Sequence, residues 1–138
     1  MIGGIVARLK QEVGRDVLRA VEGALDLAAL DGAPQAPCAW VIPVGDSAKP
    51  SGMATIVSQM VTEQFAIVIA VKAPNDKTGA KGVDALGATR DAVRAAVLGW
   101  APSGREPIEY RGGRLIDLKA GTVWWLDQYV TETLIRSE

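Results

Sequence analysis

The sequence predicts one domain that combines helices with strands, and two kinds of periodicity carry this prediction. Over residues 61–72, large apolar side chains alternate with smaller or polar ones, which is the period of a β-strand. Over residues 2–13 and 83–99, apolar side chains recur three and four positions apart, which is typical of a helix with one buried face. With 138 residues, 49% of them hydrophobic, the chain is long enough for a core of its own, and we expect a single domain spanning residues 1–138.

Residues 55–72 are predicted to form the long central strand of the sheet. One face of this strand is large and branched, so we expect it to lie on the core, whereas the opposite face is mixed and should be only partly covered. The first face consists of Val61, Phe65, Ile67, Ile69 and Val71. The apolar run 39–45 should pair with this strand in antiparallel orientation. Pro43 within that run must face outward or sit at a bulge, because proline has no amide hydrogen to donate.

The next elements follow from helical spacing and from turn residues. Residues 17–28 also have helical spacing, but Gly23 in their middle argues for a break. Residues 46–54 and 73–82 are rich in glycine, proline and polar residues, so we expect two exposed loops. Residues 83–99 should form the second main helix. Its predicted apolar face consists of Val83, Leu86, Val93, Val97 and Trp100.

The last third of the chain is typical of strands. Residues 107–111 form one short predicted strand, Gly112 and Gly113 form a turn or a bulge, and residues 114–118 continue that strand or return. Residues 122–135 should form a long final strand. Both of its faces carry large apolar groups, which suggests contact with something beyond the helices of the same chain.

Composition and charge narrow the range of partners. Lys and Arg number 15 against 16 Asp and Glu, so a net charge of −1 gives no general reason to expect binding to nucleic acid or to an anionic membrane. The first ten residues do not have the pattern of a signal peptide, and no apolar run approaches the ~18–20 residues of a membrane span. The single cysteine, Cys38, cannot form an internal disulfide and is interpreted as a small buried apolar residue.

Catalytic constellations are nearly absent from the sequence. The chain has no histidine, which removes the commonest general base and metal ligand. Asp84 and Asp91 lie close to Arg90 and Arg94 on the second predicted helix, which is typical of a solvated, salt-bridged face. Glu63 lies on the apolar face of the central strand. It is either a buried acid suited to carboxylate chemistry or, as we favour, a carboxylate near a sheet end or paired with an arginine.

The glycine-rich segments do not form a phosphate-binding motif. Residues 46–52 and 75–82 lack the order and spacing of the P-loop. Arg111 and Arg114 flank Gly112 and Gly113 and are placed to touch phosphate, but a solvated turn is the favoured interpretation. The sequence therefore predicts no catalytic residue, no cofactor and no metal site.

Taken together, the elements and three local motifs resemble the tail terminator proteins of long-tailed bacteriophages. The motifs are LGWAP at residues 98–102, YRGGRLIDL at 110–118 and TVWWLDQYVTETLIR at 122–136. The segments MIGGIVARLK and RAVEGALDLAAL, at residues 1–10 and 19–30, also look like that family. The resemblance covers nearly the whole chain, and its specificity lies in the combination and order of the motifs, since each of them is structural rather than chemical.

The resemblance implies an α+β fold with a mostly antiparallel sheet and two main helices packed on one face. It also implies a short strand near residues 18–22, where helical spacing had favoured a helix, followed by a short helix after Gly23. The implied function is mechanical: a hexameric ring caps the tail tube, stops its polymerisation and provides the surface that joins the head connector or stopper protein. DNA passes through the channel without specific binding. Such a protein would be assembled in the bacterial cytoplasm and reside in the virion tail.

A ring of this kind needs contact surfaces, and the residues indicate where they lie. We expect Trp124, Trp125 and Tyr129 to be subunit-interface anchors, because aromatic residues dominate interface energetics, although ordinary core positions are the alternative. The two predicted loops are candidates for docking on the tube or connector, with plain connecting loops as the alternative. The docking residues are Asp46, Lys49, Pro50, Met53, Asn75, Asp76 and Lys77.

Two further hypotheses are kept open, and the first belongs to a different functional class. The first is a small α+β enzyme using carboxylate chemistry around Glu63. The second is another minor head-tail joining protein with a different docking position.

Overall fold

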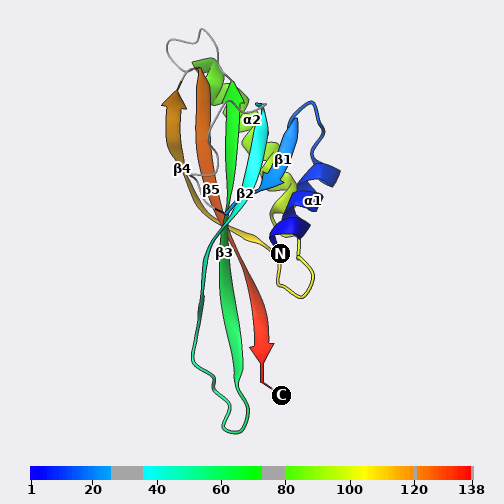
Figure 1. Ribbon diagram of the computed structural model, residues 1–138, viewed down its shortest axis with the longest axis vertical. Coiled ribbons are helices and arrows are strands. Elements are labelled where there is room, and N and C mark those ends of the chain that lie inside the picture. Colours follow the sequence, from blue (N-terminus) through cyan, green and yellow to red (C-terminus); the bar gives the residue numbers. More distant parts are fainter. Residues whose placement is uncertain (26–35, 73–79, 120, 138) are drawn as a thin grey trace.

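A single five-stranded sheet with two helices on one face makes up the described part of the protein (Figure 1). The structure is a computed structural model that describes residues 1–25, 36–72, 80–119 and 121–137. The elements in chain order are α1 (Ile2–Glu12), β1 (Ala20–Gly23), β2 (Cys38–Ala48), β3 (Ser58–Lys72), α2 (Ala80–Val97), β4 (Glu109–Lys119) and β5 (Thr122–Arg136).

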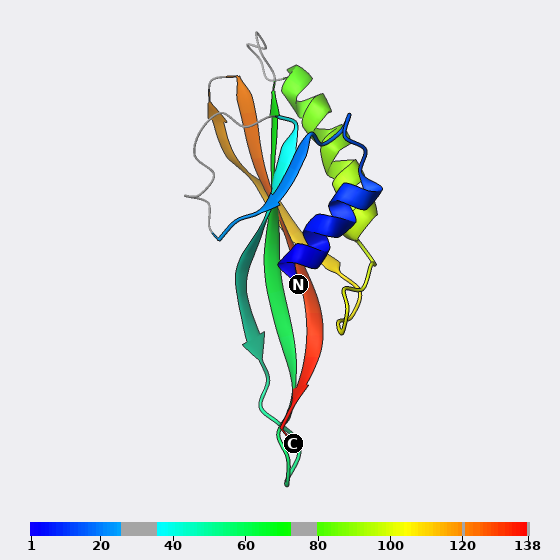
Figure 2. The same ribbon diagram turned by 45° about the vertical axis from the view of Figure 1, so that its right-hand side comes forward.

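The sheet has the strand order β1-β2-β3-β5-β4 and is mostly antiparallel. Among the described strands, only β1 and β2 run parallel, while β2–β3, β3–β5 and β4–β5 are antiparallel pairs. Both helices lie against the same side of the sheet (Figure 2). The predicted α+β fold is therefore confirmed, with β3 in the centre as the alternation indicated.

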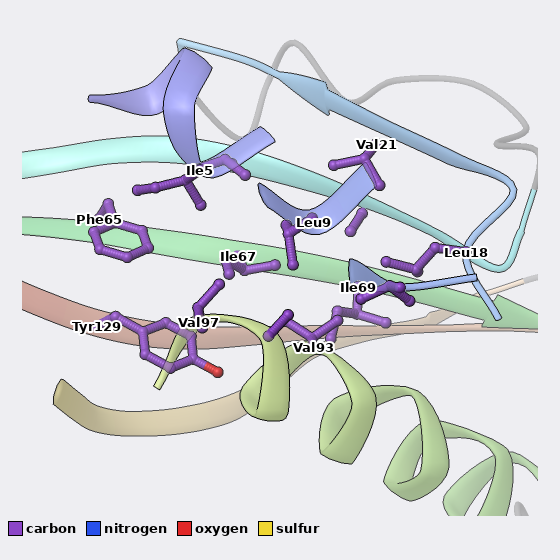
Figure 3. Packing of buried hydrophobic residues seen from close by; sticks show 14 of the residues in the cluster. Ile5, Leu9, Leu18, Val21, Phe65, Ile67, Ile69, Val93, Val97 and Tyr129 are labelled. Carbon is purple, nitrogen blue, oxygen red and sulfur yellow. The ribbon is translucent and has the colours of Figure 1, made fainter. Parts of the chain in front are cut away.

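The main core lies between the helices and the sheet (Figure 3). Phe65, Ile67 and Ile69 of β3 are fully buried there beneath Leu9 of α1 and Val93 of α2. Each such side chain contributes roughly 1.5–3 kcal/mol on burial, so this face of β3 is a large part of what holds the helices in place.

The opposite face of β3 is covered more completely than we expected. Ala66, Val68 and Ala70 are no more than 1% exposed, although the mixed composition of this face predicted partial cover. The cover comes from the neighbouring strands: Trp40 of β2 and Trp124 of β5 pack over this face. Large side chains from adjacent strands can bury small ones without a helix, and the alternation pattern of one strand does not report that.

The segment after α1 is a strand, not a helix. β1 pairs in parallel with β2, with Val21 opposite Ala39, so backbone pairing overrides the helical spacing of residues 17–28. The strand implied near residues 18–22 is present at Ala20–Gly23. Most of the short helix expected after Gly23 lies outside the described residues, since the description stops at residue 25.

Several predicted boundaries differ from the observed ones. β2 continues to Ala48 instead of ending at Gly45, and its register shifts between Pro43 and Gly45, where proline would otherwise interrupt the ladder. α2 begins at Ala80, within the region predicted as a loop, and Val83 of its predicted apolar face is 67% exposed. Gly99 follows α2 with a φ of 79°, a left-handed conformation that glycine adopts without strain and that commonly ends helices.

Gly112 and Gly113 lie inside a strand rather than in a turn between two strands. β4 runs unbroken from Glu109 to Lys119, so residues 114–118 continue the first predicted strand. Its register with β5 shifts between Tyr110 and Gly112 and again between Leu115 and Asp117. The two glycines therefore mark a bulged strand, which was one of the two interpretations left open.

Candidate assembly surface

At one end the sheet continues well past the helices as a narrow, three-stranded extension (Figure 1). It consists of residues 44–64 and 131–137, and we call it the extension. Ala48 of β2 lies opposite Val61 of β3, and Met60 of β3 lies opposite Leu134 of β5. The rest of the described chain, with both helices and the core, is called the body.

Apolar side chains on the extension are exposed. Met60 and Leu134 form a register pair on the sheet face away from the helices, and Ile135, the next residue of β5, points to the other face. Six large apolar residues of the extension are between 39% and 51% exposed: Val44, Met53, Val57, Met60, Leu134 and Ile135. Such a concentration of exposed apolar residues on a small projecting sheet is typical of a surface that a partner covers.

The extension also has two open strand edges within the described part of the chain. β1 pairs with β2 only as far as Val41, which leaves the outer edge of residues 44–48 without a neighbouring strand. β4 pairs with β5 only from Val130 onward toward the body, and the amide of Glu106 then donates to the carbonyl of Glu132. Beyond that bond, the outer edge of residues 134–136 has no strand partner.

The predicted docking loops are placed as follows. Asp46 belongs to β2 rather than to a loop, and its side chain is exposed on the extension. Lys49, Pro50 and Met53 are exposed in the connection between β2 and β3, at the far end of the extension. Asn75, Asp76 and Lys77 lie outside the described residues.

The three predicted aromatic anchors occupy different environments. Tyr129 is fully buried in the body and stacks on Phe65 with 5.6 Å between ring centroids, so its side chain has no surface left for a partner. Trp125 is half-buried on the helix side of the sheet. Trp124 is half-buried on the other side and stacks on Trp40 at 5.4 Å. Of the three, only the two tryptophans retain exposed area.

A buried carboxylate on β5 gathers three side chains around it. Asp127 is 0% exposed, and its Oδ2 accepts a hydrogen bond of 3.0 Å from Nε of Arg90. Its Oδ1 accepts from a terminal nitrogen of Arg90 at 2.9 Å, from Nε1 of Trp125 at 2.9 Å and from the hydroxyl of Tyr110 at 3.3 Å. Arg90 also lies over the Trp125 ring, 4.5 Å from its centroid. The hydrogen bond to Asp127 raises the pKa of Arg90, so the guanidinium stays charged.

Gly113 makes room for this cluster. It lies opposite Asp127 in the β4–β5 register, and a Cβ at this position would clash with the Asp127 carboxylate. The same Cβ would come within 2.8 Å of the Trp125 ring nitrogen and of the Tyr110 hydroxyl. The second glycine of the YRGGRLIDL motif is thus explained by the close approach of three polar groups, and β4 is tied to α2 through them.

Sequence reasoning did not single out Asp127 or Trp40. A charged residue at the centre of an otherwise apolar strand is a signal for a buried, paired carboxylate, because an unpaired one would be too costly. Asp127 has this signal, since Trp125 and Tyr129 on either side share its face. For Trp40 no comparable signal exists, because its stacking on Trp124 depends on the β2–β3–β5 order of the sheet.

Of the carboxylates considered for chemistry, Glu63 has an arginine partner, whereas Asp84 and Asp91 are exposed to solvent. Nε of Arg105 lies 2.6 Å from Oε1 of Glu63, so the carboxylate is paired with an arginine, as we favoured. Arg90 and Arg94 do not pair with Asp84 and Asp91 in the described chain; Arg90 binds Asp127, and Arg94 lies over the Tyr110 ring at 4.7 Å. The expected salt bridges are therefore wrong, because both arginines turn toward the sheet, but Asp84 and Asp91 are exposed to solvent as expected.

Three remaining features concern metal binding, the Cys38 thiol and membrane-spanning helices. In the part of the chain that the structure describes, no group of three or more candidate ligands could hold a metal ion. Cys38 is buried at 2% exposure. Burial, together with the nearby charge of Glu22, raises the pKa of its thiol to about 12, so the thiol is neutral and poorly nucleophilic at physiological pH. Among the described helices, none is long and apolar enough to cross a membrane.

Comparison with known proteins now assigns the chain to a family. The family model described as phage tail terminator protein matches residues 2–138. The chain belongs to this family. As a tail terminator family member, it is a structural protein of the phage tail.

The structural comparison agrees on the fold of this tail terminator family member. A chain in a structure described as the virion of a native gene transfer agent particle matches with a TM-score of 0.64 and 15% identity. The match covers 98% of this chain and 95% of that chain. A search of curated proteins finds no match.

Proposed function

We propose that this protein assembles as a hexameric ring that caps the phage tail tube. The ring stops further polymerisation of the tube protein and offers its opposite side to the head connector or stopper protein. Family membership supports the mechanical role, and the observation on the chain itself that carries the proposal is the extension. A projecting sheet with exposed apolar residues on both faces is suited to burial between neighbouring proteins rather than to contact with water.

A closed ring of identical subunits uses two unlike surfaces on each copy, because every contact is head to tail. The extension and the body are two different surfaces of one copy, as a head-to-tail contact requires. Trp124, half-buried on the open face of the sheet, is the predicted anchor best placed for a neighbouring copy, and Trp125 has partial exposure on the helix side. Tyr129 is not part of the proposed interface, because it is fully buried.

The connection at the far end of the extension is proposed to dock on the tube or on the connector. Lys49, Pro50 and Met53 are exposed there, at the point most distant from the helices. The predicted segment with Asn75, Asp76 and Lys77 remains a second candidate docking loop. DNA is proposed to cross the ring without specific binding, which a subunit with a net charge of −1 favours over a strongly basic one.

Tail length tests the proposal. Host cells infected with a phage that lacks this protein should release overlong, headless tails, seen by negative-stain electron microscopy, and supplying the protein from a plasmid should restore tails of normal length. Headless tails of normal length would contradict the capping role and favour the alternative of a minor head-tail joining protein. Glu63→Gln should retain capping, because the proposal gives Glu63 no chemical step.

A further inference from the structure

An acidic patch lies where the extension meets the body. A shallow pocket here is floored by apolar side chains, including Met60 and Val130, and carries three exposed glutamates. The glutamates are Glu106, Glu109 and Glu132, and we call them the acidic patch. They form no ion pair among the described residues, and no basic side chain lines the pocket.

A basic patch lies at the opposite edge of the sheet, beside β1. A second pocket, formed by the end of α1, the following turn and β1, is lined by Val13 and Leu18 and by three exposed basic residues. The basic residues are Lys10, Arg15 and Arg19, and we call them the basic patch. Glu22 is the single carboxylate of the lining, and no ion pair joins any of the three basic residues to the described chain.

The two patches cannot neutralise each other within one copy. The basic patch lies beside β1, at one edge of the sheet, and the acidic patch lies on the β5–β4 side, at the opposite edge. The chain as a whole is nearly neutral, so the separation of charge is local rather than a consequence of composition. Each pocket combines an apolar floor with an excess of one sign of charge, and the two excess charges are opposite.

We infer that the acidic patch of one copy binds the basic patch of the next copy around the ring. This inference rests on the proposed ring and specifies which surfaces form its contacts. A cyclic contact must join two different patches on opposite sides of the subunit, which is how these two are placed. The complementary charges select the partner surface and the alignment of the two copies, and the apolar floors of the two pockets supply the area that is removed from water. The partner is a second copy because the complementary surface is on the same chain.

Charge reversal tests the contact without touching the core, because all the altered residues are exposed. The double variant Glu106→Lys/Glu132→Lys carries two basic patches, and Lys10→Glu/Arg15→Glu carries two acidic ones. Each variant alone should lose ring formation, with self-association weakened by about 100-fold or more because like charges then face each other. An equimolar mixture should recover it, since the two variants can alternate around a ring with an even number of subunits.

Native mass spectrometry and electron microscopy of the ring give the readout. The mixture should give particles with the subunit number of the unaltered protein, in solution or on the ends of purified tail tubes. The matched control, Asp84→Lys/Asp91→Lys, reverses two exposed carboxylates of α2 and should assemble as the unaltered protein does. Assembly should weaken between about 0.05 M and about 0.5 M salt, because exposed charge pairs are screened.

The outcomes separate this inference from the proposed function. If each reversed variant alone forms normal rings, or if the mixture stays unassembled while the unaltered protein forms rings, the patch contact is wrong and the ring stands. If the unaltered protein forms no ring in solution or on tubes, the proposed function fails and the inference falls with it. If Lys10→Glu/Arg15→Glu forms rings but loses binding to duplex DNA, the basic patch is a nucleic-acid surface and the inference is overturned.

Discussion

Strands β2, β3 and β5 run through both the body and the extension, and the two regions differ in what covers them. In the body, β3 is buried on both faces, by the helices on one side and by Trp40 and Trp124 on the other. In the extension, the same strand exposes Met60, and its β5 partner exposes Leu134 and Ile135. The body is therefore stabilised by its own core, although it also exposes apolar residues such as Leu115 and Leu118, whereas the extension exposes six large apolar residues over a much shorter length of chain.

The strongest way to break the body is to remove its buried carboxylate. Asp127→Ala leaves Arg90 without its ionic partner and removes the acceptor for Trp125 and Tyr110, so we expect the free energy of unfolding to fall by about 3–5 kcal/mol. Denaturant unfolding followed by tryptophan fluorescence measures this. Asp117→Ala, which removes an exposed aspartate of β4, is the control and should stay within about 0.5 kcal/mol. A loss below about 1 kcal/mol for Asp127→Ala would contradict the role of the cluster.

A smaller loss is expected from Gly113→Ala. The added Cβ meets the Asp127 carboxylate, so the cluster must shift, at about 1–3 kcal/mol. Gly45→Ala is the matched control in another strand, because a Cβ added there would have no atom within 4 Å. In the Asp127→Ala background, Gly113→Ala should cost clearly less than alone, which a double-mutant cycle measures. Equal costs in both backgrounds would show that the glycine is needed for another reason.

The thiol of Cys38 has a smaller effect, which depends on pH. Burial raises the pKa of this thiol from 9.0 to about 12, so its contribution to stability is complete below pH 9.0 and is lost as pH rises toward 12. Plots of the free energy of unfolding against pH for the unaltered protein and for Cys38→Ala should therefore be parallel below about pH 8.5, because the thiol is then protonated in both the folded and the unfolded chain. By about pH 10 the unaltered protein should lose on the order of 1 kcal/mol more than the variant. Parallel curves up to about pH 10.5 would refute the buried-thiol account.

The smallest effect on stability, and the largest on assembly, is expected in the extension. Met60→Ser/Leu134→Ser changes two exposed side chains, so the free energy of unfolding should stay within about 0.5 kcal/mol per substitution. Ile67→Ala, in the core, should cost about 2–5 kcal/mol. The extension variant should nevertheless fail to restore normal tail length to phage lacking the protein. Normal tails with this variant would mean that the exposed pair does not contact a partner.

The sequence predicted most of the fold because the periodic segments coincide with real elements. The alternation over residues 61–72 identified the central strand, and the spacing of Ile5 and Leu9 identified α1. The prediction from periodicity failed for residues 17–28, because their spacing suits a helix, whereas the observed strand depends on pairing with β2, which is distant in sequence. The end of β2 was missed for a related reason: residues 46–48 are polar and turn-like, yet they extend the ladder opposite β3.

The candidate surface was harder to predict than the fold. Aromatic content alone grouped Trp124, Trp125 and Tyr129, but burial separates them, and burial depends on which strands and helices face each residue. The exposed pair of Met60 and Leu134 could not be foreseen from either strand alone, because it is created by the β3–β5 register and by the reach of the sheet past the helices.

The open strand edges of the extension have a consequence for the free subunit. Amide and carbonyl groups beside Val44 and beside Leu134 and Ile135, which no described strand pairs, offer a template on which another chain can add as a strand. Concentrated stocks of the isolated protein should therefore form fibres that start from the projecting strands while the globular part stays folded. In the infected cell, rapid incorporation into the tail should therefore protect the subunit from aggregation. A subunit whose strand edges are covered by neighbouring subunits no longer offers an edge on which aggregates can grow.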